Sequence, residues 1–537
     1  MINNPGRAVV TVISLAAAVC FVNGGKQYAS DSGKEPYQFH HELAADADSF
    51  IGTDVIPEDY IVGEDFTSHL PLIVLDTHGQ KIVNYKYYDT ETDSFRYRDG
   101  VNPYTNVSVQ VIDNEDHVNT LSDNAAILSE GRIKIRGNGS SMLPKSQYRL
   151  QLLDEDGNKT KQPLLGLGAA SEWVLNGSLY DPSYLRNYLG YNLGHIMDAD
   201  SPEVRFCEVI VKTEEGYRYD GLYLLIETVG RGEGQVNIQK YNPDIVPTSY
   251  IVRRDRVDDS EIRIRTYVDE IKMSEKWRKN TKANLQLSLI YPGASNVTQR
   301  SIDYISEDIS KTERIIYAGN DDDLFKQYPA YIDVDSFVNY FLINELLMNY
   351  DSGIHSTYMY KELDGKLTMG PVWDFDSAID NATGSLANFE YMVMKERPYF
   401  DRLCMDERFI DKLSSRYRQL RKGVLSDANI SKIVGETSVF LGKAVDREHQ
   451  RWGGYSYAVD ISEEEDTGLS VDRNRQSYEN EVTRLQDAIL LHADYLDEHL
   501  DDRDNIMADN AEKNFPALLF LIIFFISIVL VQRARKI

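Results

Sequence analysis

The stretch from Asn349 to Ile379, NYDSGIHSTYMYKELDGKLTMGPVWDFDSAI, constrains the fold of this chain more than any other part of the sequence. It contains two runs typical of β-strands, Ser356–Glu362 and Lys366–Trp373. Between them stands the pair Asp364-Gly365, which favours a two-residue hairpin turn because glycine adopts positive φ angles without steric cost. The sequence therefore predicts a β-hairpin here.

Three acidic residues gather at the open end of this predicted hairpin. The turn sets a register in which His355 lies opposite Asp374, and Asp351 lies just beyond, within about 10 Å if the chain curls back. Asp374 and Asp376 are two residues apart, so in extended backbone their side chains point the same way and can share one cation. Three carboxylates repel one another unless a cation neutralises them, which predicts a divalent-metal site. The alternative is that each is a solvated or capping side chain.

Composition narrows the class of protein. The chain has 537 residues, enough for two domains or one large two-lobed domain, and a net charge of −28. This acidic balance argues against a nucleic-acid partner, which would need a basic surface. With three cysteines and no H-E-x-x-H spacing, the sequence predicts neither a disulfide framework nor a zinc site.

Apolar runs stand near both ends. Ala8 to Val22 has the length of a signal-peptide core, although an uncleaved anchor is an alternative. Phe515 to Val531 would form a helix about 26 Å long, enough to cross a bilayer core. Basic residues follow it and acidic ones precede it, so the positive-inside rule places the C-terminus in the cytoplasm. We therefore expect a single-pass cell-membrane protein whose bulk is extracytoplasmic.

Strand patterns come first and helical patterns afterwards, which predicts an α+β, two-lobed architecture with a β-rich N-lobe and a helical C-lobe. Val252 to Asp323 is charged and irregular and is expected to form helical insertions. Asp181-Pro182 is expected to open a helix, with Asp181 as its N-cap, and a second helix is expected from Asp333 to Tyr350. The predicted segments are a signal peptide or anchor at 1–24, a polar tether at 25–64, the N-lobe at 65–250, the C-lobe at 251–505 and a transmembrane helix at 515–532.

A glycine-bearing loop joins two alternating strands of the predicted N-lobe. It runs from Gly137 to Gln147, after Arg132–Arg136. Its backbone N–H groups, the Ser140 hydroxyl and the Lys145 ammonium together would suit a phosphate group. Most such loops bind nothing, and this one matches neither a Walker A nor a G-x-G-x-x-G motif. Further along, Glu227 ends the apolar strand GLYLLIE, an unusual place for a charge.

Four motifs in this order carry a resemblance: RIKIRGNGS…PKSQYRLQL, LRNYLG, GLYLLIE and NYDSGIHSTYMYK…GPVWDFD. The chain resembles the CotH family, the spore coat protein H-like kinases, from about Leu70 to Asn381. The resemblance implies an atypical protein-kinase-like fold that uses ATP and Mg²⁺ or Mn²⁺ to phosphorylate serine on proteins. By this resemblance, Asp351 would be the catalytic acid, Lys145 and Glu227 would lie at the nucleotide, and Asp374 would hold the metal, with Ser356 at the position of a second metal ligand. To these we add, from the loop and from the spacing of the acidic residues, Gly137 and Ser140 at the nucleotide and Asp376 at the metal.

Two departures from the family pattern leave a second hypothesis open. Many relatives carry Asn at the position of Ser356, and the loop reads GNGSSM where GNSS is more usual. The first hypothesis is a Ser/Thr protein kinase with a serine-rich protein substrate from a spore coat or cell surface. The second is a catalytically silent kinase-like module that binds such a partner. A third, metal-dependent adhesion, rests on the acidic composition alone.

Overall fold

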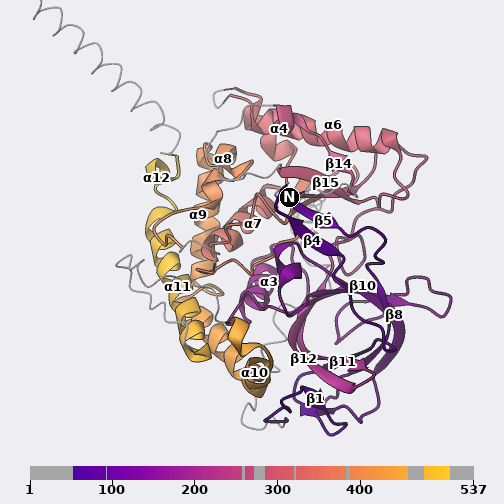
Figure 1. Cartoon of the computed structure of the whole chain (residues 1–537). Helices are drawn as coiled ribbons and strands as arrows, with labels where there is room; N and C mark the ends of the chain where they lie inside the picture. Colours follow the sequence, from indigo (N-terminus) through magenta and orange to yellow (C-terminus); the bar gives the residue numbers. More distant parts are fainter. Residues whose placement is uncertain are drawn as a thin grey trace, which may run out of the picture.

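The computed structural model describes residues 52–91, 94–256, 261–270, 285–319, 322–381, 387–456 and 477–507. In this part of the chain strands dominate the first half and helices the second, so the protein is a mixed α/β structure (Figure 1).

The first half folds into a closed β-barrel, the ring of strands at the lower right of Figure 1. The strands follow the order β12-β10-β9-β8-β6-β3-β11, and β11 pairs with β12 to close the ring. All these pairs are antiparallel except β3 with β11, which is parallel. The bounds are β3 Leu72–Asp76, β6 Thr105–Ile112, β8 Ile127–Ile135, β9 Tyr148–Leu153, β10 Glu172–Asn176, β11 Val204–Thr213 and β12 Gly216–Glu227.

Alternating apolar residues fill the barrel, as the period-two patterns of its strands require. The buried cluster includes Val109, Ile133, Leu150, Trp173 and Val209. Several short elements accompany the barrel. The strand β1 (Ile61–Val62) pairs with β12. Two further strand pairs are β2 (Thr67–Ser68) with β7 (Asn119–Thr120) and β4 (Lys86–Asp89) with β5 (Ser94–Tyr97), and η2 (Gly139–Met142) is a short helix.

A second sheet of five strands follows, in the order β14-β15-β13-β16-β17. The predicted helical insertions between Val252 and Asp323 are therefore wrong in part, because this segment supplies three of its strands as well as one long helix. The strands are β13 Tyr250–Arg256, β14 Arg263–Ile264, β15 Leu285–Tyr291, β16 Thr357–Lys361 and β17 Leu367–Met369.

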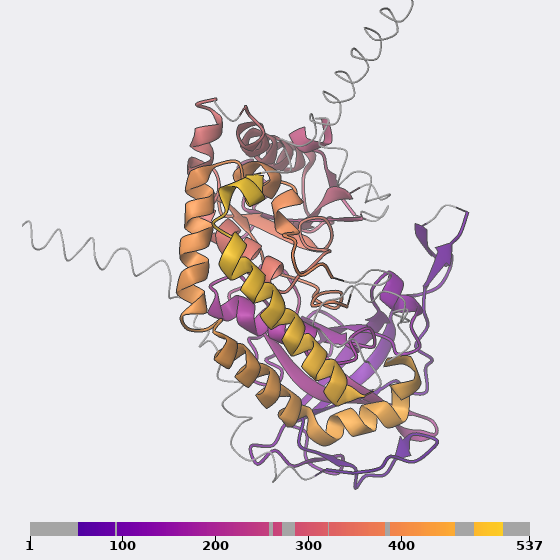
Figure 2. The ribbon, with the colours of Figure 1, turned by 90° about the vertical axis from the view of Figure 1, so that its left-hand side faces the viewer.

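Helices pack around this sheet and against one side of the barrel. In Figure 2, α11 runs from the part of the molecule that holds the second sheet down to the barrel. The helix α10 bends at Gly442, whose φ is 39°. The helices are α3 Arg186–Ile196, α4 Tyr267–Glu270, α6 Gln299–Ile316, η3 Phe325–Ala330, α7 Val334–Leu346, η4 Met394–Glu396, α8 Phe400–Leu403, α9 Glu407–Arg421, α10 Asp427–Ser456, α11 Tyr478–His499 and α12 Arg503–Met507.

The hairpin predicted around Asp364-Gly365 is present with a different register. Lys361 pairs with Leu367, one position away from the predicted pairing. The Gly365 N–H donates to the Glu362 carbonyl at 2.8 Å, and the residue with positive φ is Asp364, at 59°. The turn is therefore centred one residue earlier, because aspartate tolerates the left-handed conformation well enough to take the glycine's place.

No helix in the described ranges is long and apolar enough to cross a bilayer. The longest helices, α10 and α11, carry charged residues and bury one face against the core. This finding corrects the predicted fold class, which included a transmembrane helix, and the predicted single-pass membrane localisation. The run Phe515 to Val531 itself lies outside the described residues, as does Ala8 to Val22.

The predicted tether at 25–64 is described from residue 52 onward, and there it belongs to the fold. Ile56 and Val62 are buried, and Ile61–Val62 pairs with β12. The Ile56 N–H donates to Gln450 Oε1 of α10 at 2.9 Å. The composition of this segment is polar, but its few apolar side chains are enough to fix it.

Candidate functional site

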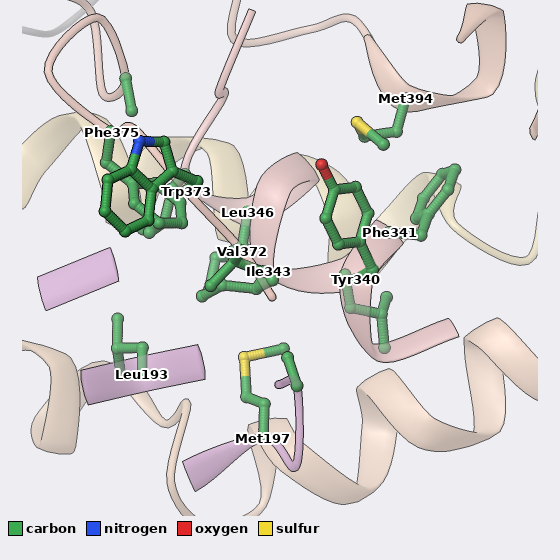
Figure 3. Packing of buried hydrophobic residues seen from close by; sticks show 14 of the residues in the cluster. Leu193, Met197, Tyr340, Phe341, Ile343, Leu346, Val372, Trp373, Phe375 and Met394 are labelled. Carbon is green, nitrogen blue, oxygen red and sulfur yellow. The ribbon is translucent and has the colours of Figure 1, made fainter. Parts of the chain in front are cut away.

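The segment predicted to bind a metal, residues 372–376, lies between α3, α7 and the barrel, and we call it the acidic segment. Its apolar residues Val372, Trp373 and Phe375 pack into the core beside Leu193 of α3 and Leu346 of α7 (Figure 3). This packing anchors the backbone on either side of Asp374, so the two carboxylates are held at the edge of a rigid core.

A glycine in α3 permits this close packing. A Cβ atom on Gly190 would lie 2.4 Å from ring atoms of Phe375. Distances below 3.0 Å are not tolerated between such atoms, so only glycine allows the acidic segment to lie against the helix.

Asp374 and Asp376 are close together but bind different neighbours. Asp374 has a φ of 66°, so the backbone is not the extended one that the sequence suggested. Ser356 Oγ donates to Asp374 Oδ2 at 3.3 Å, and the Asp374 N–H donates to the Tyr191 hydroxyl at 3.2 Å. Asp376 instead accepts a short hydrogen bond from Asn187 Nδ2.

Burial raises the pKa of both carboxyl groups, to about 6 for Asp374 and about 8 for Asp376. Asp351 adds to the shift of the Asp374 pKa, while Asp374 and Asp181 add to that of Asp376. Arg136, from the end of β8, opposes both shifts but does not cancel them. A bound cation would lower both pKa values, because it would favour the charged form of each carboxyl group.

Asp351 stands in the turn after α7, which ends at Leu346 and not at Tyr350 as predicted. The Asp351 carbonyl accepts the His355 N–H at 2.7 Å, which curls the chain back toward the hairpin. Its carboxylate is near enough to raise the pKa of Asp374 and also interacts electrostatically with Arg397. The predicted approach of Asp351 to Asp374 is thus present.

In the described part of the chain no three His, Cys, Asp or Glu side chains form a group able to hold a metal ion. The convergence of three carboxylates on one cation, as the sequence suggested, is therefore wrong. Two buried amide oxygens without hydrogen-bond partners fit a cation instead. They are Asn349 Oδ1 and Asn381 Oδ1, whose amide nitrogens donate to the Asp374 and Asp376 carbonyls. Carboxylate, amide and hydroxyl oxygens are the donors that Mg²⁺ and Mn²⁺ prefer.

Lys145 is completely buried and lies in an ion pair that the sequence did not predict. Its Nζ donates to Glu448 Oε1 of α10 at 2.7 Å and to the Leu222 carbonyl at 2.6 Å. Burial lowers the pKa of Lys145, and Glu448 opposes that change. Lys145 also packs on Gly177, next to Asn176, whose side chain hydrogen-bonds to Asp376.

The glycine-bearing loop lies at the end of β8, beside Arg136. Gly137 has a φ of 92°, and a Cβ there would collide with the Ser140 side chain. The Gly137 carbonyl accepts from Lys86 Nζ at 2.9 Å. The Arg136 guanidinium lies over the Trp373 ring, 5.9 Å from its centroid, so the base of this loop reaches the acidic segment.

Glu227 is the last residue of β12, where the chain leaves the barrel for the second sheet. It is buried, and its Oε2 accepts the Glu203 N–H at 3.0 Å. The structure thus places Glu227 at the junction of the two parts.

Sequence reasoning missed several polar residues of this site: Arg136, Asn187, Tyr191, Asn349, Asn381 and Glu448. A signal was available for two of them. Asn187 and Tyr191 stand one turn apart on a helix that is otherwise buried, and so share a face. Asn349 and Asn381 lie in the same stretch of sequence as the Asp374 and Asp376 that they contact. The contacts of Arg136 and Glu448 join segments far apart in sequence and leave no local pattern.

A family model described as CotH kinase protein matches residues 133–496. The matched range begins in β8 and ends in α11, so it includes both carboxylates, Lys145 and Glu448. Comparison with curated proteins gives no match.

Proposed function

Because the chain belongs to the CotH kinase protein family, we propose that it transfers the γ-phosphoryl group of ATP to a serine or threonine hydroxyl of a protein. The observation that carries the proposal is the carboxylate pair Asp374 and Asp376, whose pKa values are raised beside the cationic Arg136. Phosphoryl transfer asks a protein chiefly to position its reactants and to neutralise charge. A cation site beside an arginine suits that task.

The divalent cation would be held by Asp374 and Asp376, with the Ser356 hydroxyl and the amide oxygens of Asn349 and Asn381 nearby. When bound, Mg²⁺ or Mn²⁺ supplies charge neutralisation for the phosphates. Arg136 would supply a second positive charge to the same phosphate groups.

Asp351 would accept the proton of the attacking hydroxyl. As the hydroxyl oxygen bonds to the γ-phosphorus, the bond from that phosphorus to the ADP oxygen breaks, and the proton passes to the carboxylate. The Asp351 carboxylate lies near Asp374 without sharing its hydrogen bonds, which suits a separate role.

The buried pair of Lys145 and Glu448 is a second feature in favour of this function. Protein kinases use a Lys–Glu ion pair to place a lysine against the nucleotide phosphates. Here the ammonium uses two of its three N–H groups on Glu448 and Leu222. The loop that carries Gly137 and Ser140 and the junction residue Glu227 would then flank the nucleotide.

A silent module that binds a partner without transfer is the second candidate. The complete burial of Lys145 favours it, since the ammonium has no exposed surface for a phosphate.

The full chain should be incubated with γ-labelled ATP, Mg²⁺ or Mn²⁺ and a serine-rich polypeptide. Label that appears in the polypeptide supports the kinase, and ATP-dependent thermal stabilisation without any transfer supports the silent module.

A further inference from the structure

Five buried charged side chains lie next to the acidic segment and have none of the roles proposed above. They come from three separate parts of the chain: Asp181 and Arg186 at the start of α3, Asp380 after the acidic segment, and Glu481 and Arg484 in α11. Each of these side chains is at most 1% exposed.

The five form a continuous chain of ion pairs. Arg186 Nη1 contacts Asp181 Oδ1 at 2.5 Å, and Arg186 Nη2 contacts Glu481 Oε1 at 2.8 Å. Glu481 in turn accepts from Arg484 at 2.7 and 2.9 Å. Arg484 Nη1 then donates to both the Asp380 carboxylate and its carbonyl, each at 2.7 Å. We call Arg186, Glu481 and Arg484 the clamp.

The clamp holds the backbone that follows Asp376. Arg186 Nε donates to the Ala378 carbonyl at 2.9 Å, and Nη2 donates to the Ile379 carbonyl at 3.0 Å. Ile379 and Asp380 have φ values of 51° and 55°. This left-handed conformation is tolerated by aspartate but is costly for a β-branched residue such as Ile379. Such a conformation persists only where the surroundings impose it. Here the surroundings are two arginines that bind consecutive carbonyl groups.

We propose that Arg186, Glu481 and Arg484 are positioning residues, which fix the loop after Asp376 and thereby make α11 part of the cation site. The inference rests on the proposed function, because the cation is what the loop would be positioned to hold. The predicted helix start at Pro182 is wrong, because α3 begins at Arg186. The Asp181 carboxylate accepts the Ser183 N–H, the Arg186 guanidinium and the backbone N–H of Arg186, the first residue of the helix.

The test is Glu481→Gln in the full chain, which keeps the shape of the side chain but removes the charge shared by two arginines. Its matched control is Glu208→Gln, which weakens another fully buried Arg–Glu pair, with Arg447 at 2.7 Å, in contacts separate from the acidic segment. Two readouts are needed: Mn²⁺ affinity from electron paramagnetic resonance, and hydrogen exchange of the Ile379 amide, which donates to the Leu347 carbonyl at 2.8 Å.

We expect Glu481→Gln to weaken Mn²⁺ binding at least tenfold and to speed exchange at Ile379, while Glu208→Gln changes neither. Equal Mn²⁺ affinity in folded Glu481→Gln and wild type would overturn the inference, as would an equal loss in both variants. If Glu481→Gln does not fold, Arg484→Lys replaces it with the same expectation, because lysine cannot bind Glu481 and Asp380 in the same fork geometry. Wild type that binds no Mn²⁺ would refute the proposed function, and exchange at Ile379 would still decide whether the clamp holds the loop.

Discussion

Asp374 and Asp351 lie in one cluster of charges but differ in their contacts. Asp374 accepts a hydrogen bond from Ser356 and interacts electrostatically with Arg136. Asp351 lies in a separate turn and interacts electrostatically with Arg397. If the proposed function is right, replacing Asp374 by Ala should abolish thermal stabilisation by ATP with Mg²⁺, because the proposed cation site loses a carboxylate. Differential scanning fluorimetry measures this shift, and a shift equal to that of wild type would exclude Asp374 as a metal ligand.

Asp351→Asn should behave differently. Asparagine keeps the size of the side chain but accepts no proton, so transfer should fall by about 10²-fold or more with nucleotide binding nearly unchanged. Single-turnover transfer of labelled phosphate measures the rate. A related substitution, Ser356→Asn, should tighten metal binding if the site binds a metal ion. A complete loss of nucleotide binding in Asp351→Asn would show that Asp351 holds the metal.

The buried His69 makes the free energy of unfolding depend on pH, and this effect is independent of catalysis. Burial lowers the pKa of His69 to about 4, and its Nε2 lies 2.7 Å from the Phe440 carbonyl of α10. Between pH 6.5 and 4 the unfolded chain binds a proton here that the folded chain does not. The contribution of His69 to the free energy of unfolding is therefore fully present above pH 6.5, and about 3 kcal/mol of it is lost as the pH drops to 4. Urea unfolding of wild type and His69→Gln over this range should show a shallower pH dependence in the variant, and parallel curves would contradict the assignment.

At the scale of elements, the contact between α3 and the acidic segment is the least tolerant of change. Gly190→Ala should destabilise the fold by about 1–3 kcal/mol, because the new Cβ must displace the buried Phe375 ring. It should weaken Mn²⁺ binding as well, since Phe375 lies between the two carboxylates. Thermal unfolding and Mn²⁺ titration provide the measurements.

The control is Gly435→Ala in α10, where no atom lies within 4 Å of the added Cβ. There alanine should stabilise the protein by about 0.5–1 kcal/mol, because glycine is unfavourable inside a helix. A Gly190 variant as stable as the Gly435 variant would mean that the segment and α3 are not in close contact.

Local patterns predicted the hairpin and the strands of the first half, but they missed the strands between Val252 and Asp323 and predicted few of the contacts between elements. The hairpin at β16–β17 and the approach of Asp351 to Asp374 follow from turn chemistry and from a short stretch of chain. Closure of the barrel does not, because β11 must pair with β3 and β12 at once. The ion pair of Lys145 with Glu448 joins residues 303 positions apart, and one sequence has no pattern at that distance.

At the scale of the whole molecule, the first described residues are tied to one of the last helices. Arg447 Nη1 donates to the Thr53 carbonyl at 2.7 Å, and Gln450 Nε2 donates to the Asp54 carbonyl at 3.0 Å. A chain that begins at residue 65 should therefore be less stable than one that begins at residue 51, by about 3 kcal/mol or more, since it loses the buried side chains of Ile56 and Val62. Thermal midpoints of the two chains provide the comparison, and equal midpoints would show that the segment 52–64 is dispensable.

Glu448 and the two clamp residues of α11, Glu481 and Arg484, stand late in the sequence, which has a consequence for synthesis. At about 5–20 residues per second, Lys145 leaves the ribosome roughly 15–60 s before its carboxylate partner exists. Throughout that interval the nascent barrel holds a lysine without its counter-ion, and the acidic segment lacks the helix that fixes its loop. A chain released early would thus lack both the Lys145–Glu448 ion pair and the contacts that fix the loop after Asp376. The proposed activity would begin only when translation is almost complete, and ribosomes stalled before α11 should carry chains that cannot transfer phosphate.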